Sequence, residues 1–199
     1  MSGRLSKATA SRRGSGPSDM GGSPSPSLPK WPHRYESTGV VHAPMDQVFV
    51  HLDDHTQLSA HMGESSWKLG GGRMGVQLDE GRGQVPGSRI RLSGRVFGLQ
   101  LSVDEVVTEH DPPRRKAWET IGTPTLLVIG HYRMGFELSR QGEDSLLRVG
   151  IDYALPVAAP ARWLGRAFAR YYARWCTQKM VDDAVRHFAT LDASRASRP

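Results

Sequence analysis

The chain has almost no cysteine and no long run of apolar residues. Cys176 is the one cysteine among 199 residues, which excludes an internal disulfide and a metal site built from several thiolates. The longest apolar segments, such as residues 126–130, have the length of a strand and fall short of the ~18 residues of a membrane helix. No apolar stretch of the secretory type stands near the N-terminus. We therefore expect a protein of a reducing, cytoplasmic compartment.

The net charge is also small over most of the chain, although the whole chain has a formal net charge of +6. Residues 1–33 hold a net charge of +4 and residues 192–199 a net charge of +1, which leaves +1 for residues 34–191. A nucleic-acid-binding domain normally presents a basic face, so we expect no specific contact with nucleic acid. Residues 1–33 are rich in Ser, Gly, Pro and Arg and are predicted to be a disordered basic tail. Residues 192–199 are predicted to be a second disordered tail, and residues 34–191 one domain.

Strand patterns dominate the middle of this domain. Tyr132, Met134 and Phe136 alternate with polar neighbours such as Arg133, which is typical of an antiparallel strand with one wet face and one apolar face. The same reasoning predicts seven strands, at residues 35–43, 73–80, 88–97, 99–110, 116–122, 126–138 and 145–155.

Helix patterns stand at both ends of the domain. Pro44 suits the first turn of a short helix over residues 44–54, and a second short helix is predicted at about 55–62. From Pro160 a helix of about 30 residues is predicted, because no Gly-Pro break interrupts it. Small residues recur on one side of it, where the helix can lie close to a sheet: Gly165, Ala169, Ala173, Cys176, Met180 and Ala184. The predicted fold is α+β, a curved seven-stranded antiparallel sheet with two short helices and a long C-terminal helix around a cavity.

Three segments carry a resemblance to a known superfamily: HAPMDQVFVHLDD (42–54), VVTEHDPPRRKAWE (106–119) and GHYRMGFEL (130–138). Together with the terminal helix they resemble the START-like, or SRPBCC, superfamily over about residues 35–190. This superfamily includes the polyketide cyclase/dehydrase and lipid-transport families and the plant pollen-allergen fold. The resemblance implies a helix-grip fold around a cavity for a hydrophobic small molecule or lipid. It brings no catalytic motif of any one subfamily and no cofactor.

Eight aromatic or apolar side chains are the candidate ligand-binding residues. Five of them lie on the predicted concave face of the sheet, where they either line a ligand or pack as core: Trp118, Tyr132, Met134, Phe136 and Tyr153. The hydroxyls of Tyr132 and Tyr153 are candidates for orienting a ligand. The other three form a ridge on the terminal helix that faces either the cavity mouth or solvent: Phe168, Tyr171 and Trp175.

Two other functions stay open beside ligand binding. A cyclase-type enzyme would use the same cavity, with a tyrosine or Glu119 assisting proton transfer, and a buried Tyr–acid or Tyr–His pair would favour it. We assign no catalytic residue from the sequence. A membrane-surface protein would contact anionic lipid through the basic tail and a row of arginines: Arg162, Arg166, Arg170 and Arg174.

Three further motifs are given structural interpretations. His51 and His55 stand four residues apart, with His61 nearby, but the Glu of a zinc-protease helix is absent, so we expect no metal. The glycines of residues 70–75 match a phosphate-binding pattern, yet strand and turn residues follow where that motif needs a helix, so we expect no nucleotide. Cys176 is interpreted as a small buried hydrophobic residue.

Overall fold

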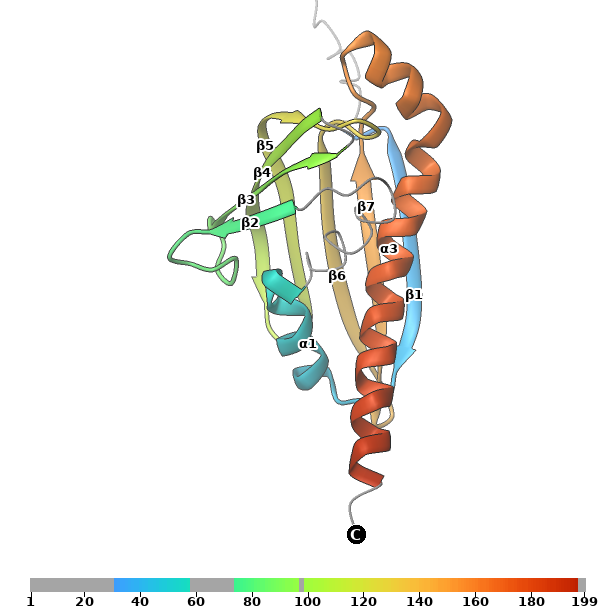
Figure 1. Ribbon diagram of the computed structural model, residues 1–199. Coiled ribbons are helices and arrows are strands. Elements are labelled where there is room, and N and C mark those ends of the chain that lie inside the picture. The colour runs from blue at the N-terminus through green and yellow to red at the C-terminus, as the bar shows by residue number, and fades with distance from the viewer. Residues whose placement is uncertain (1–30, 58–73, 97–98, 197–199) are drawn as a thin grey trace, which may run out of the picture.

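The computed structural model describes residues 31–57, 74–96 and 99–196, and Figure 1 shows one curved sheet with a long helix laid across it. The strands follow the order β1-β7-β6-β5-β4-β3-β2, and each neighbouring pair is antiparallel. This arrangement confirms the predicted helix-grip-like α+β fold. The elements are β1 (His33–Val41), α1 (Met45–Asp53), β2 (Met74–Leu78), β3 (Arg89–Val96), β4 (Leu99–Asp111), β5 (Arg115–Thr125), β6 (Tyr132–Gln141), β7 (Asp144–Tyr153) and α3 (Ala159–Ala196).

Strand β6 starts later than the sequence analysis predicts. The expected strand covered residues 126–138, whereas β6 begins at Tyr132 and β5 continues to Thr125. Residues 126–130 instead pass beneath the start of α3: a Cβ at Gly165 would lie 2.7 Å from the carbonyl oxygen of Val128. The amide of Gly130 donates to the carbonyl of Ala154 at 2.8 Å, which ties this segment to the end of β7. The apolar run therefore covers the end of the core and does not lengthen the strand.

Helix α3 packs on β1 and β7 through its small residues. The Ser37 and Thr177 hydroxyls are hydrogen-bonded at 2.8 Å, and a Cβ at Gly39 would lie 2.5 Å from Cγ1 of Val181. Every member of the predicted stripe is buried: Gly165, Ala169, Ala173, Cys176, Met180 and Ala184. The helix is 38 residues long and runs past residue 191, where the domain was expected to end. No helix among the described residues is long and apolar enough to cross a membrane.

Helix α1 covers the opposite end of the sheet from the start of α3 (Figure 1). Pro44 occupies its N-cap with a φ of −62°, and Asp46 lies in its first turn, near the positive end of the helix dipole. Its apolar side, Val48, Phe49 and Leu52, is buried. Residues 55–57 are helical again, but most of the second predicted helix, at 58–62, lies outside the described residues, as do residues 1–30 of the predicted tail.

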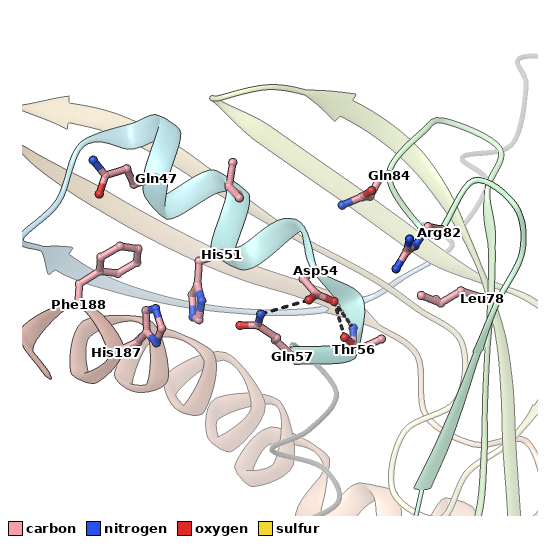
Figure 2. A pocket seen from close by; sticks show the side chains of 11 residues that line it. Gln47, His51, Asp54, Thr56, Gln57, Leu78, Arg82, Gln84, His187 and Phe188 are labelled. Carbon is pink, nitrogen blue, oxygen red and sulfur yellow. Dashed lines mark hydrogen bonds between the residues drawn. The ribbon is translucent and has the colours of Figure 1, made fainter. Parts of the chain in front are cut away.

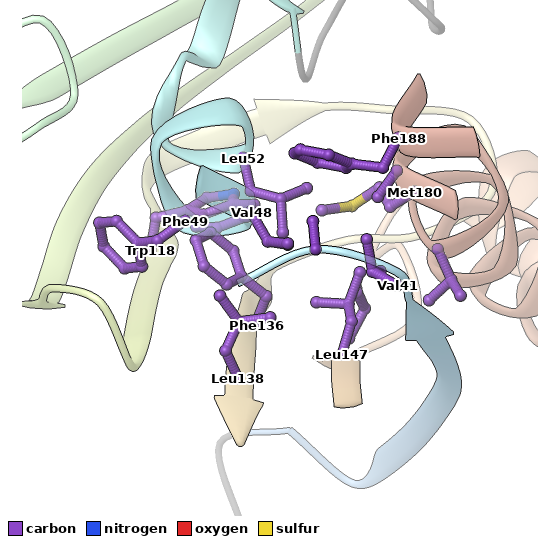
Figure 3. Close-up of a cluster of buried hydrophobic side chains, with 14 residues drawn as sticks. Val41, Val48, Phe49, Leu52, Trp118, Phe136, Leu138, Leu147, Met180 and Phe188 are labelled. Carbon is purple, nitrogen blue, oxygen red and sulfur yellow. The ribbon is translucent and has the colours of Figure 1, made fainter. Parts of the chain in front are cut away.

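The core consists of two clusters on the inner face of the sheet. The first, drawn in Figure 3, joins α1 to the C-terminal half of α3 across β6 and β7, and Phe49, Phe136 and Phe188 are among its members. The second lies toward β3 and β4 and includes Ile90 and Tyr132. Among the described residues, Met134, near the start of β6, packs against both clusters.

Candidate functional site

The five predicted ligand residues of the sheet lie on its inner face. Trp118, Tyr132, Phe136 and Tyr153 are buried, whereas Met134 is only partly buried. Trp118 and Phe136 belong to the first cluster, and Tyr132 and Tyr153, which are a cross-strand pair, belong to the second. The structure therefore brings these five together around the junction of the two clusters.

The three predicted ligand residues of α3 have a different environment. Tyr171 is 71% exposed and Phe168 is 50% exposed, so both side chains lie on the solvent side of the helix. Trp175 is partly buried, with its ring centroid 5.9 Å from that of Tyr172. Trp163, which the sequence analysis did not single out, is also 71% exposed. The four arginines of this segment are exposed as well: Arg162, Arg166, Arg170 and Arg174.

The interior holds a buried cation that the sequence analysis did not assign to any site. Lys116 of β5 is 0% exposed. Its ammonium donates to Oδ1 of Asp53 at 2.6 Å, to the carbonyl oxygen of Asp53 at 2.9 Å and to Nδ1 of His55 at 3.2 Å. An ammonium has three donors, and here each of them has an acceptor. The Asp53 carboxylate, at the end of α1, also accepts from Nε2 of His110 at 3.1 Å.

The bond to Lys116 fixes the tautomer of His55. Because an ammonium can only donate, Nδ1 of His55 accepts and the ring proton is assigned to Nε2. Burial and the charge of Lys116 lower the pKa of His55 to about 3, against the charge of Asp53, which raises it. His55 is therefore neutral at physiological pH, and its ring lies edge-on to Trp118 at 5.0 Å.

A tyrosine–acid pair lies next to this network. The hydroxyl of Tyr132 donates to Oε1 of Glu105, and the Glu105 side chain is 2% exposed. Its other oxygen, Oε2, has no hydrogen-bond partner among the described residues and lies 3.9 Å from Nε2 of His55. Burial raises the pKa of Glu105 to about 7. The Tyr132 hydrogen bond, the nearby indole N–H of Trp118 and the charge of Lys116 act against burial and lower it. Glu105 is thus a buried acid that changes protonation near neutral pH.

Two groups on α3 face the same region. Burial and the charge of Glu105 raise the pKa of Tyr132, and the electrostatic influence of Tyr172 and Cys176 adds to this. Burial raises the pKa of the Cys176 thiol to about 12, against the neighbouring Tyr172 hydroxyl, which lowers it. A thiol with such a pKa is not a nucleophile at neutral pH, in agreement with a packing role for Cys176.

The alternation of inward and outward side chains along the strands could have indicated that Glu105 and Lys116 are buried. Glu105 stands two residues from both Val103 and Val107, which are buried, so it shares their inward direction. Lys116 stands in the same relation to Trp118. An inward-facing charge in a strand is costly unless it is paired or protonated, and so marks a candidate functional position.

A pocket opens between α1, the turn after β2 and the C-terminal half of α3 (Figure 2). Its volume is about 450 Å³. The rings of His51 and His187 stack in it with centroids 3.9 Å apart, and Asp54 accepts hydrogen bonds from Thr56 and Gln57. None of the eight predicted ligand residues belongs to its lining, which consists of Gln47, Val50, His51, Asp54, Thr56, Gln57, Leu78, Arg82, Gln84, His187 and Phe188.

The two histidines four residues apart do not share a site. His51 stacks on His187, whereas His55 is bonded to Lys116, because α1 ends between them at Asp53. The part of the chain that the structure describes contains no group of three or more His, Cys, Asp or Glu side chains placed to hold a metal, and His61 lies outside it. The glycine motif of residues 70–75 also falls mostly outside the described residues, and strand β2 begins within it.

Solved structures of similar fold match most of the chain. An aromatase/cyclase, Zhui from Streptomyces sp. R1128, is similar with a TM-score of 0.54 at 20% identity, over 77% of this chain and 94% of that one. Ara h 8.0201 is similar with a TM-score of 0.53 at 14% identity, over 79% and 98%. The protein TTHA0849 from Thermus thermophilus is similar with a TM-score of 0.53 at 13% identity, over 77% and 97%. At these identities the likeness shows the fold alone.

The sequence comparisons are more specific about the family. No curated protein matches the chain. The model of the family described as polyketide cyclase/dehydrase and lipid transport matches residues 32–189, which covers every described strand and α1 and most of α3. The chain therefore belongs to the polyketide cyclase/dehydrase and lipid-transport family of the START-like superfamily.

Proposed function

We propose that this protein binds a hydrophobic small molecule or lipid between the inner face of its sheet and α3. The family supports this function, since its description joins cyclases and lipid transport. The proposed walls are the inner-face side chains of β5, β6 and β7, with Trp175 at the helix side: Trp118, Tyr132, Met134, Phe136 and Tyr153. Phe168 and Tyr171 are exposed and would reach a ligand only at the surface.

The incomplete burial of Met134 is the observation that carries the proposal. Met134 is the third residue of β6, a strand with β5 on one side and β7 on the other, and it faces inward between Tyr132 and Phe136. Both of these neighbours are buried, whereas Met134 is not. An inward-facing apolar side chain on an interior strand of a sheet is normally covered by close packing. Space left beside it is available to an apolar ligand.

The pocket of Figure 2 is the proposed entrance through which a ligand reaches the interior. Its volume of about 450 Å³ falls within the range of small-molecule sites. Two of its apolar members connect it to the interior: Phe188 belongs to the first cluster, and Leu78 packs against the second.

Ligand binding is tested by filling the space beside Met134. Native mass spectrometry of freshly purified protein should show a co-purified small molecule, and apolar compounds should raise the melting temperature of the stripped protein. Met134→Trp should abolish both effects, because the larger side chain occupies the space. Val157→Trp is the matched control, since Val157 is 89% exposed. Absence of any bound compound and of any thermal shift with the unaltered chain would contradict the proposal.

A cyclase-type enzyme is the second candidate function. The buried pair of Tyr132 and Glu105 favours it, because an acid with a pKa near 7 can both take and return a proton at neutral pH. Such a pair would assist aldol-type ring closure and water loss in a poly-β-ketone. Turnover of a poly-β-ketone analogue should then be lost in Glu105→Gln while binding of the analogue is retained. No turnover by the unaltered chain would exclude this function for that substrate class.

Contact with an anionic membrane is a further proposed property. The first half of α3 exposes Trp163 and Tyr171 beside its arginines, and no acidic residue occurs from 159 to 181. Aromatic and basic side chains together suit the interface of an anionic bilayer. The double variant Arg166→Glu/Arg170→Glu should no longer sediment with anionic vesicles, whereas Arg186→Glu, farther along the helix, should still do so. Sedimentation that is equal with neutral vesicles would contradict an electrostatic contact.

A cytoplasmic location is part of the proposal. Cys176 is buried, and a lone unpaired thiol suits a reducing compartment.

A further inference from the structure

Oxygen Oε2 of Glu105 has no partner at hydrogen-bonding distance among the described residues, although the Trp118 indole N–H lies near enough to the carboxyl to lower its pKa. The side chain is 2% exposed, so bulk water does not reach this oxygen. Buried polar atoms in folded proteins are almost always hydrogen-bonded, and an exception calls for an explanation. The other oxygen of the same carboxyl is bonded to Tyr132, so the side chain is held in a defined position.

The neighbours of this oxygen link it to the partly buried Met134. Trp118 lies directly opposite Met134 in the register of β5 and β6, and its ring touches that of His55. Nε2 of His55 is 3.9 Å from Oε2, which is beyond hydrogen-bonding distance. Oε2 thus lies near His55, whose ring contacts Trp118, the residue opposite the partly buried Met134.

The described part of the interior offers no unbonded cation to an anionic ligand. Lys116 is the one buried cation of the described residues. Its three donors are already bonded, two to Asp53 and one to His55. A ligand carboxylate in this site would therefore face the Glu105 carboxyl without a counter-ion from the residues that the structure describes.

We propose that Oε2 of Glu105 binds a hydroxyl group of the hydrophobic ligand, an alcohol or a phenol, and that the site rejects ligands whose polar group is a carboxylate. This inference rests on the proposed function, because it assigns the polar group of the ligand held in the interior. A hydroxyl can donate to the Glu105 carboxylate and can accept from its protonated form, so it pairs with both states. A carboxylate only accepts and adds a like charge in a medium of low dielectric constant.

Three compounds that share one ring system test the inference: 2-naphthol, naphthalene and 2-naphthoate. A second trio of different shape, 1-dodecanol, dodecane and dodecanoate, guards against a poor steric fit. Affinities are measured at pH 7.5 by displacement of a fluorescent apolar probe from the stripped protein. We expect the alcohol or phenol to bind at least about tenfold tighter than the hydrocarbon, and the carboxylate to bind weakest.

The Glu105→Gln variant shows whether Glu105 is responsible. An amide has no charge and can donate to a carboxylate, so the variant should bind the carboxylate at least about tenfold more tightly than the unaltered chain does. Glu143→Gln, on the exposed turn between β6 and β7, is the matched control and should keep the original ranking. If Glu105→Gln does not fold, the ranking of the three compounds by the unaltered chain still decides the matter.

The possible failures are distinguishable. If neither trio displaces the probe and the probe itself does not bind, the proposed ligand-binding function fails. If the compounds bind but the carboxylate equals or exceeds the alcohol, only the assignment of Glu105 to a hydroxyl fails. The same holds if Glu105→Gln folds and leaves the ranking unchanged.

Discussion

Replacement of Glu105 by glutamine should change how the stability of the protein depends on pH. Burial raises the pKa of Glu105 from its ordinary value of 4.5 to about 7 in the folded chain. Between these two values the folded state keeps a proton that the unfolded state has released. The free energy of unfolding therefore falls as pH rises through this window, since the unfolded state binds fewer protons than the folded state.

The expected magnitude follows from the pKa shift. One pKa unit corresponds to ~1.4 kcal/mol, so Glu105 should lower the free energy of unfolding by about 3 kcal/mol between pH 4.5 and pH 7. The amide of the introduced glutamine does not titrate, so the variant lacks this loss. His55 acts in the opposite direction between pH 3 and 6.5, because its lowered pKa makes the folded state bind fewer protons there. That contribution is present in both proteins and largely cancels in their difference.

Urea denaturation at pH 4.5, 5.5, 6.5 and 7.5 measures the effect. The unfolding free energy of Glu105→Gln minus that of the unaltered chain should increase with pH by about 3 kcal/mol over this range. Glu143→Gln, which is exposed, should show no such trend. Parallel stability curves for Glu105→Gln and the unaltered chain would refute the reasoning, since they would mean that Glu105 titrates alike in both states.

Three further predictions concern other buried groups. Lys116→Met should destabilise the fold by about 3–5 kcal/mol in urea denaturation, because it leaves the Asp53 carboxylate without its cation. Adding Asp53→Leu should recover part of that loss of stability, and no recovery would contradict the pairing. Gly165→Val should cost about 1–3 kcal/mol or more, since a Cβ there would lie 2.7 Å from the Val128 carbonyl oxygen, and an unchanged melting temperature would argue against this close contact. Cys176 should not react with a thiol reagent at pH 8 until the protein unfolds, because burial raises its pKa to about 12; rapid labelling of the folded chain would contradict this.

Local periodicity was enough to predict most of the fold. The alternation of Tyr132, Met134 and Phe136 predicted which side chains of β6 face inward. The small residues of α3 predicted which side of that helix packs on the sheet. Both patterns repeat within a few residues, so they can be read without knowing the partner. The family resemblance agreed with them, and the family match confirms it. The assignment of ligand-binding residues stays a prediction.

The tertiary structure alone decided which polar groups meet. Lys116 is 63 residues from Asp53, and Glu105 is 27 residues from Tyr132, so no local pattern links either pair. The pairing of β4 with β5 also has irregular register near residues 102–104 and 107–109, which shifts the alignment of the two strands. The sequence determined which side chains face inward, because that depends on the period of each element. Which of them touch, and whether an aromatic residue such as Tyr171 faces sheet or solvent, depends on register and on how helices cross the sheet.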